Sequence, residues 1–384
     1  MMVLSMALVL VGSLIGPWGG ITTVIIGRAL QGLGTALVPV AMSVMRDELP
    51  GHRMSGAIAL ISTTLGIGGS TGIPLGGVFA SLWGWESLFW ISAGLAAVSL
   101  ALMAILIPHR EPHARQPFDY IGAFLLSAAL ILILLGISQG KAWGWTSLPI
   151  LGSLVGGLLL AVLFVCFEAR KDAALVNIEV NAQRPIMLTN AASLLMGIAM
   201  FTNLLVTSLH LQGTVEEHGF AQNATVAGLA MVLSAIIMFF MPAITSYLVN
   251  KFGAEQVLIG GGFLTGAAYL LRAMTSIHIT MVIIWAMVAS AGVALTYAVF
   301  PLLIMANAPH HHTAATNGLN ALIRAIGTTV ASAAVAAISA TFLISHNGTS
   351  STSWTGILAI FGIGAVASLL AAVCGWAVKK PADN

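Results

Sequence analysis

The sequence has 384 residues, of which 58% are hydrophobic and only 7% are charged, and its mean hydropathy is +1.00. Because roughly 25% of the residues of a soluble domain are charged, this composition excludes an ordinary water-facing surface and indicates a protein embedded in lipid. A net charge of +2 and only two cysteines, both in apolar runs, argue against nucleic-acid binding, a disulfide framework and a cysteine-rich metal site.

Apolar segments long enough to cross a bilayer recur along the whole chain. We expect all of them to be helices, because lipid offers backbone groups no hydrogen-bond partners. The first segment is the shortest and weakest of the set. In chain order, the expected spans are 2–17, 20–45, 56–80, 87–107, 119–138, 147–167, 186–210, 223–248, 256–273, 278–304, 314–344 and 355–377.

Basic residues are distributed unevenly between the loops that join these spans. Ten of the 14 lie in one alternating set of loops, and only Lys141 and Arg272 are assigned to the opposite set. The positive-inside rule therefore predicts that both termini lie in the cytoplasm. We expect a multi-pass protein of the plasma (inner) membrane. The remaining two basic residues, Arg28 and Arg324, fall inside expected spans.

Arg28 is the first candidate functional residue. An Arg at mid-helix costs about 2.5–3.5 kcal/mol on insertion scales, so it usually faces a bundle interior or a wet cavity. Gln31 lies on the same helical face, which favours a cavity, although a snorkelling or purely structural Arg also fits the pattern. Gly32 and Ala36 form a small-residue step at which a neighbouring helix could approach closely.

A glycine-rich face follows in the next span. Gly68, Gly72 and Gly76 recur every four residues, Gly77 follows directly, and Pro74 adds a kink. Such a face permits tight helix contact, which ordinary membrane packing and moving bundles both require.

The most polar face of any expected span surrounds Arg324. Asn317, Asn320, Arg324 and Thr328 fall on one stripe at helical spacing, which predicts a wet cavity or an interhelical hydrogen-bond network. In the span 186–210, Met200 and Asn203 are candidate lining residues of a substrate pathway.

Several of these segments resemble the fourteen-span drug:proton antiporters of the major facilitator superfamily. "RALQGLGTALVP" is similar to the family's fourth-span motif, whose Arg is implicated in proton coupling, which implies a coupling or gating role for Arg28 and Gln31. "GIGGSTGIPLGG" resembles the fifth-span antiporter motif, with Pro74 one residue later than the usual Gly-Pro pair, and "NGLNALIRAIG" resembles the penultimate span.

The resemblance also implies a domain organisation. The Arg28 motif stands in the second span here rather than the fourth, so the first two spans of the family pattern are missing. The expected all-α major facilitator fold, with about 12 transmembrane helices, then divides into a partial N-terminal bundle (1–107), a cytoplasmic loop with two linker spans (108–185) and a six-helix C-terminal bundle (186–384).

The function implied is secondary active transport: proton-coupled efflux of drugs or other small hydrophobic molecules by alternating access. The expected partners are a small-molecule substrate, a proton and the lipid bilayer, with no nucleic acid and no cofactor, in a monomer. No P-loop or hydrolase motif appears, so an enzyme is not expected. No Asp or Glu lies well inside an expected span, which leaves the proton carrier unassigned. The alternative is a truncated or degenerate paralogue that does not transport.

Overall fold

A computed structural model describes residues 2–34, 37, 40–41, 44, 76, 79, 82–106, 119–171, 176–309, 312–346 and 349–379. Within these ranges the chain is helical apart from one small β-hairpin, and nine helices are long and apolar enough to cross a membrane. Two shorter apolar helical segments precede them, Met2–Trp18 and Ile21–Leu33. The predicted all-helical architecture is therefore confirmed.

Part of the predicted glycine-rich face cannot be placed. Gly68, Gly72, Pro74 and Gly77 lie outside the described residues, as does most of the expected span 56–80. Gly76 is described as a half-buried helical residue. The role of this face as a contact between bundles therefore stays a prediction.

The chain divides into two compact units, Met1–Gln116 and Pro117–Asn384. The first contains α1 (Met2–Ile15), the short turn η1 (Gly16–Trp18), α2 (Ile21–Leu33) and α5 (Glu86–Leu106). In this unit α1 packs against both α2 and α5.

Glycines bring α1 and α2 into backbone contact. A Cβ atom added to Gly12 would stand 2.5 Å from the carbonyl oxygen of Gly27, and one added to Gly27 would stand 2.6 Å from that of Gly12. The close helix approach predicted at Gly32 and Ala36 stays a prediction, because Ala36 and most of the span that follows lie outside the described residues.

The second unit contains the remaining helices. They are α6 (Tyr120–Trp143), α7 (Leu148–Glu168), α8 (Ile178–Ala182), α9 (Arg184–Gln212), η3 (Val215–Glu217), α10 (Ala224–Phe252), α11 (Ala254–Thr275), α12 (Ile279–Asn307), α13 (Thr313–Thr341) and α14 (Trp354–Lys379).

Local sequence explains where several of these helices begin. The side chains of Asp119, Asn177 and Asn223 accept hydrogen bonds from backbone N–H groups of α6, α8 and α10, so each caps the helix that follows it. A single residue, Gly253, separates α10 from α11 with φ +90°, a backbone angle that glycine adopts at little cost.

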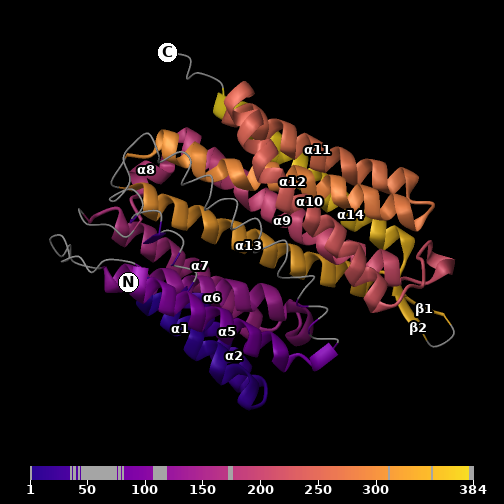
Figure 1. The fold of residues 1–384 in the computed structure, drawn as a ribbon, viewed down its shortest axis with the longest axis horizontal. Coiled ribbons are helices and arrows are strands. Elements are labelled where there is room, and N and C mark those ends of the chain that lie inside the picture. Colours follow the sequence, from indigo (N-terminus) through magenta and orange to yellow (C-terminus); the bar gives the residue numbers. More distant parts are fainter. Residues whose placement is uncertain are drawn as a thin grey trace. The chain divides into compact units, whose positions relative to one another are not determined.

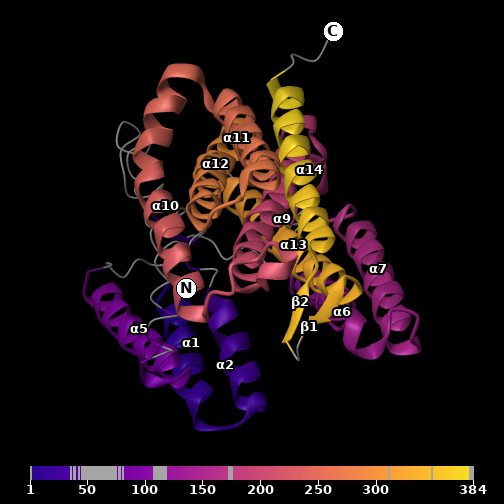
Figure 2. The ribbon, with the colours of Figure 1, turned by 90° about the vertical axis from the view of Figure 1, so that its right-hand side faces the viewer.

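Helix α9 forms the centre of the second unit. It packs against α10, α12, α13 and α14, while α11 lies against α12 and α14 (Figures 1 and 2). Half of the residues in the most apolar stretches of α9, α11, α12 and α14 are buried, compared with 17% for α6 and 22% for α7. The α6–α7 pair is therefore peripheral and largely exposed, as expected for a hairpin whose outer faces meet lipid.

The unit also contains a small hairpin that the sequence did not predict. Strands β1 (Leu343–His346) and β2 (Thr349–Thr352) pair antiparallel, with Leu343 opposite Thr352. The expected span ran to residue 344 because apolar residues continue past the last turn of α13. The helix ends at Thr341 instead, and the backbone carbonyl of Phe342 accepts a hydrogen bond from the N–H of Ser353.

Candidate functional site

The two predicted coupling residues of the first unit contact each other. Arg28 Nη1 donates to Gln31 Oε1 at 3.2 Å, and Gln31 Nε2 donates to Ser13 Oγ on α1 at 2.8 Å. The Arg28 guanidinium lies 4.9 Å from the ring centroid of buried Phe89 on α5. Arg28 is nevertheless exposed on the surface of its own unit, so its cation is held by an aromatic face and an amide rather than enclosed.

In the second unit, Asn320 joins α13 to α9. Its Nδ2 donates to Asn190 Oδ1 at 2.9 Å, and Ser193 Oγ donates to Asn320 Oδ1 at 3.3 Å. All three side chains are buried. Of the two structures that the sequence left open for this stripe, the interhelical hydrogen-bond network is the one present at Asn320.

Arg324 lies one turn further along α13 and outside this network. It is half-buried, and its guanidinium lies 4.7 Å from the ring centroid of Tyr297 on α12. On the α9 side, a Cβ added to Gly197 would stand 2.4 Å from the carbonyl oxygen of Arg324. Arg324 therefore stands where α9, α12 and α13 meet.

A third polar centre surrounds Asn203 on α9. The side-chain amide donates to the carbonyl oxygen of Ala286 and to Ser290 Oγ on α12, both at 3.1 Å. Its oxygen accepts from Arg272 Nη1 at 3.3 Å, and the same nitrogen donates to Thr207 Oγ1 at 2.9 Å. One amide thus connects α9, α11 and α12.

The placement of Arg272 corrects the sequence prediction. Arg272 was expected in a loop, but it lies in the last turn of α11 and is only 1% exposed. Side chains on a helix lean toward its N-terminus, so an Arg near the end of α11 reaches back into the unit, while Leu271 and Met274 beside it are exposed.

The surroundings of Arg272 are unusual for a cation. The groups that contact it in the described structure are the neutral side chains of Asn203 and Thr207 and the ring of Phe361, whose centroid is 5.0 Å away. Its Nε and Nη2 atoms are buried without a hydrogen-bond partner among the described residues. A buried charge with neutral acceptors is costly, which favours a functional reason for keeping it.

Two further residues, His210 and Met200, lie near these centres. His210 is 1% exposed, contacts the backbone carbonyl of His218 at 3.2 Å, and shares the Phe361 ring with Arg272. Met200 is half-buried and packs on the apolar core that includes Met196 and Phe300. The structure therefore places Met200 in packing contact rather than in a polar centre.

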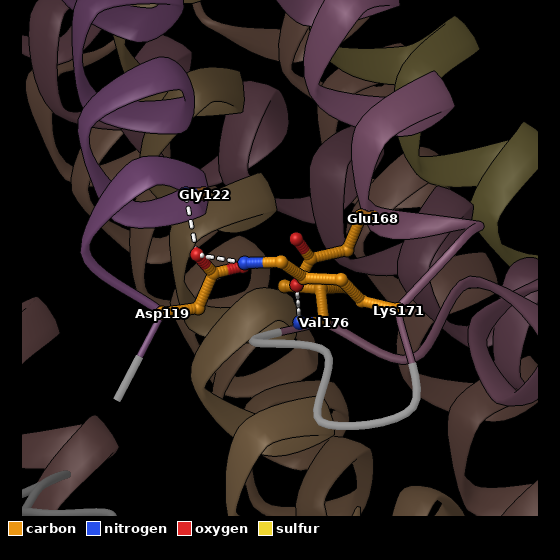
Figure 3. Close-up of polar contacts among 5 residues, drawn as sticks. All are labelled: Asp119, Gly122, Glu168, Lys171 and Val176. Atoms are coloured by element: carbon orange, nitrogen blue, oxygen red, sulfur yellow. Dashed lines mark hydrogen bonds and ion pairs between the residues drawn. The ribbon is translucent and has the colours of Figure 1, made fainter. Parts of the chain in front are cut away.

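A separate group of charges, which we call the carboxyl–lysine cluster, lies at the open end of the α6–α7 hairpin (Figure 3). It consists of Asp119 before α6, Glu168 at the end of α7 and Lys171 just after α7. Asp119 is 6% exposed and Glu168 is 1% exposed. The sequence located these acids at span ends but gave no sign of their burial, because Asp119 and Glu168 are far apart along the chain.

The sequence profile described as the Major Facilitator Superfamily matches residues 1–332 of this helical chain. The chain belongs to the major facilitator superfamily. It is accordingly a multi-pass membrane protein, and its superfamily is one of transporters rather than enzymes.

Curated relatives within the superfamily include export and resistance proteins. The chain is 26% identical over 333 residues to the tetracenomycin C resistance and export protein of Streptomyces glaucescens, which covers 85% of this chain and 60% of the relative. It is 30% identical over 258 residues to the cephamycin export protein CmcT of Amycolatopsis lactamdurans, covering 65% and 52%. The match to multidrug resistance protein Stp of Mycobacterium tuberculosis is 24% over 319 residues, covering 82% and 58%. The chain thus spans less than two thirds of each of these relatives.

Solved structures of the superfamily share the fold. A POT family transporter in complex with a thioalcohol-conjugated peptide superposes with a TM-score of 0.66 at 12% identity, covering 98% of this chain and 81% of that one. The human organic anion transporter MFSD10 superposes with a TM-score of 0.62 at 14% identity, covering 98% and 76%. At such low identity these likenesses concern the fold alone.

Proposed function

We propose that this superfamily member exports drugs or other small hydrophobic molecules in exchange for protons, by alternating access at the plasma membrane with both termini in the cytoplasm. The direction of transport is supported by the relatives, three of which are named for export or resistance. The observation that carries a transport role for the second unit is its buried cation, Arg272, with its amide partner Asn203. Intramembrane charges in apolar bundles usually mark substrate or ion pathways.

The proposal assigns roles to the residues described above. Arg28 and Gln31 serve coupling or gating, and Met200, Asn203, Asn320 and Arg324 line the substrate pathway, to which we add Arg272. The glycine-rich face at Gly68, Gly72, Pro74, Gly76 and Gly77 provides the contact between bundles. The working unit is a monomer whose partners are substrate, proton and lipid.

Export can be measured in cells that lack their own efflux pumps. Cells expressing the chain should accumulate less of a fluorescent hydrophobic cation, a polyketide antibiotic or a cephamycin than cells with an empty vector, and a protonophore should remove the difference. Membrane insertion should be checked in the same cells by fractionation. Equal accumulation of all three compounds, with the chain present in the membrane, would rule out the proposed activity.

Arg324→Ala should lower the export rate by about tenfold, which corresponds to roughly 1.4 kcal/mol of lost transition-state stabilisation. The variant loses the cation that lies on Tyr297 at the junction of three helices, an interaction worth up to about 2 kcal/mol when desolvated. Arg184→Ala is the matched control, because Arg184 is an exposed Arg at the start of α9. Equal export rates in the two variants, at equal membrane levels, would contradict a pathway role for Arg324.

A further inference from the structure

The carboxyl–lysine cluster has one strongly stabilised carboxylate. Asp119 Oδ1 accepts the backbone N–H of Gly122 at 2.9 Å and lies 2.6 Å from Lys171 Nζ (Figure 3). The Gly122 N–H and then the Lys171 ammonium hold the pKa of this carboxyl below its ordinary value of 3.8. Asp119 is therefore the member of the cluster that keeps its negative charge.

The second carboxyl of the cluster faces the first. Glu168 Oε1 accepts the backbone N–H of Val176 at 2.7 Å. Its other oxygen, Oε2, and Asp119 Oδ2 approach the same face of Gly122: a Cβ added there would stand 2.8 Å from Glu168 Oε2 and 2.6 Å from Asp119 Oδ2. The two carboxyl oxygens therefore share one small space, which exists because residue 122 has no side chain.

The space between the two carboxyls lacks a hydrogen-bond donor for Asp119 Oδ2 among the described residues. The Asp119 side chain is 2% exposed, and Oδ2 is buried without a hydrogen-bond partner among the described groups. Buried acceptors normally receive a hydrogen bond. Two ionised carboxylates can only accept, so a proton is needed to join them, and Asp119 is held in the acceptor state by Gly122 and Lys171.

The charges around the cluster agree with one bound proton. Two buried carboxyls face the partly exposed ammonium of Lys171, so a single proton makes the cluster neutral. Among the described residues of neighbouring segments, the titratable Tyr120, Arg170 and Glu179 are exposed, and His312 at the start of α13 contacts the side chain of Asn177. The face of α13 that packs here presents Leu319.

We propose that Asp119 and Glu168 share one proton, carried by Glu168, and that they form a proton-binding site at the open end of the α6–α7 hairpin. Two carboxyls in one site behave in this way because like charges at close range cannot both ionise. The site does not depend on the export activity proposed above.

The bound proton has a structural consequence. Glu168 Oε1 accepts the backbone N–H of Val176, and Val176 belongs to an apolar cluster with Leu125 of α6 and Phe164 of α7, against which Leu319 of α13 packs. Removing the proton places two carboxylates against each other, which forces Glu168 away from Asp119 and pulls on the backbone it anchors. The protonation state of the cluster thereby controls how firmly the hairpin is attached to the segment that leads into α8.

Infrared spectroscopy of the purified chain in lipid nanodiscs tests the proposal without reference to transport. Protonated carboxyls and carboxylates absorb at separate frequencies. At pH 7 the wild type should show a protonated-carboxyl band that disappears on alkaline titration, and Glu168→Gln should remove it. Glu179→Gln, which removes an exposed acid of α8, should retain it.

A second variant keeps every titratable group. Gly122→Ala fills the space between the two carboxyl oxygens and should remove the band at pH 7, whereas Gly156→Ala on α7, where an added Cβ meets only Leu132 at 3.6 Å, should not. The proposal is overturned if the wild type has no protonated carboxyl at pH 7, or if the band persists in Glu168→Gln. A sodium-dependent change in melting temperature without such a band would instead indicate a metal cation in place of the proton.

Discussion

Replacing Arg272 with Met should strongly lower the export rate while leaving the melting temperature of the protein close to that of the wild type. Met fills much of the space of the Arg side chain, and replacing a buried charged group by an apolar one of similar volume is often neutral or stabilising by about 1–4 kcal/mol. Against this, Asn203 Oδ1 loses its donor, which costs about 1–3 kcal/mol. The two effects are of similar size and opposite sign.

The export rate should respond very differently from the stability. If the cation serves the substrate pathway, its loss should lower the rate by roughly tenfold to a hundredfold, or about 1.4–2.8 kcal/mol. Arg272→Lys, which keeps the charge but not the planar guanidinium over Phe361, should retain an intermediate rate. Accumulation assays in cells measure the export rate of each variant, and thermal unfolding of the purified variants measures their stability. Wild-type export by Arg272→Met, or a large loss of melting temperature, would assign Arg272 to stability instead.

Gly327→Ala should destabilise the second unit, whereas Gly318→Ala on the same helix should not. A Cβ at Gly327 would stand 2.2 Å from the carbonyl oxygen of Leu194, and backbone atoms cannot move aside as a side-chain tip can. Overpacking of this kind costs about 1–3 kcal/mol. At Gly318 an added Cβ meets no described atom within 4 Å, so Ala there should gain about 0.5–1 kcal/mol of helix propensity.

Thermal unfolding of the two alanine variants in the same lipid or detergent provides the comparison. The melting temperature of Gly327→Ala should fall, and export should fall with it, because the crossing that is forced apart also positions Arg324 against Gly197. The melting temperature of Gly318→Ala should stay level or rise. Equal melting temperatures for the two variants would mean that α9 and α13 separate without cost.

Hydropathy predicted most of the helices because lipid selects long apolar segments regardless of how they pack. The expected spans 186–210 and 223–248 correspond to α9 and α10 with ends that differ by a few residues. Hydropathy could not predict the hairpin of β1 and β2, since its first strand continues the apolar run of α13. A turn signal, Asn347-Gly348, stood in the sequence beside it.

The candidate site was less predictable, for a different reason. Whether a residue near the end of a span is buried depends on which helix covers it, and neither Arg272 nor Glu168 carries that information in its neighbours along the chain. One signal was available on α9: Asn190, Ser193, Asn203 and Thr207 recur at spacings close to multiples of 3.5 residues and face one side. These residues contact Asn320 and Arg272 in the structure.

Because the described surroundings of Arg272 are neutral, the membrane potential acts on its uncompensated positive charge. No acidic group contacts the guanidinium in the described structure, so any displacement of α11 along the membrane normal would carry a positive charge through the electric field. Moving one elementary charge across 100 mV involves about 2.3 kcal/mol, and a partial displacement involves the corresponding fraction. A conformational change that shifts α11 is therefore biased by voltage, in a direction set by which way the helix travels.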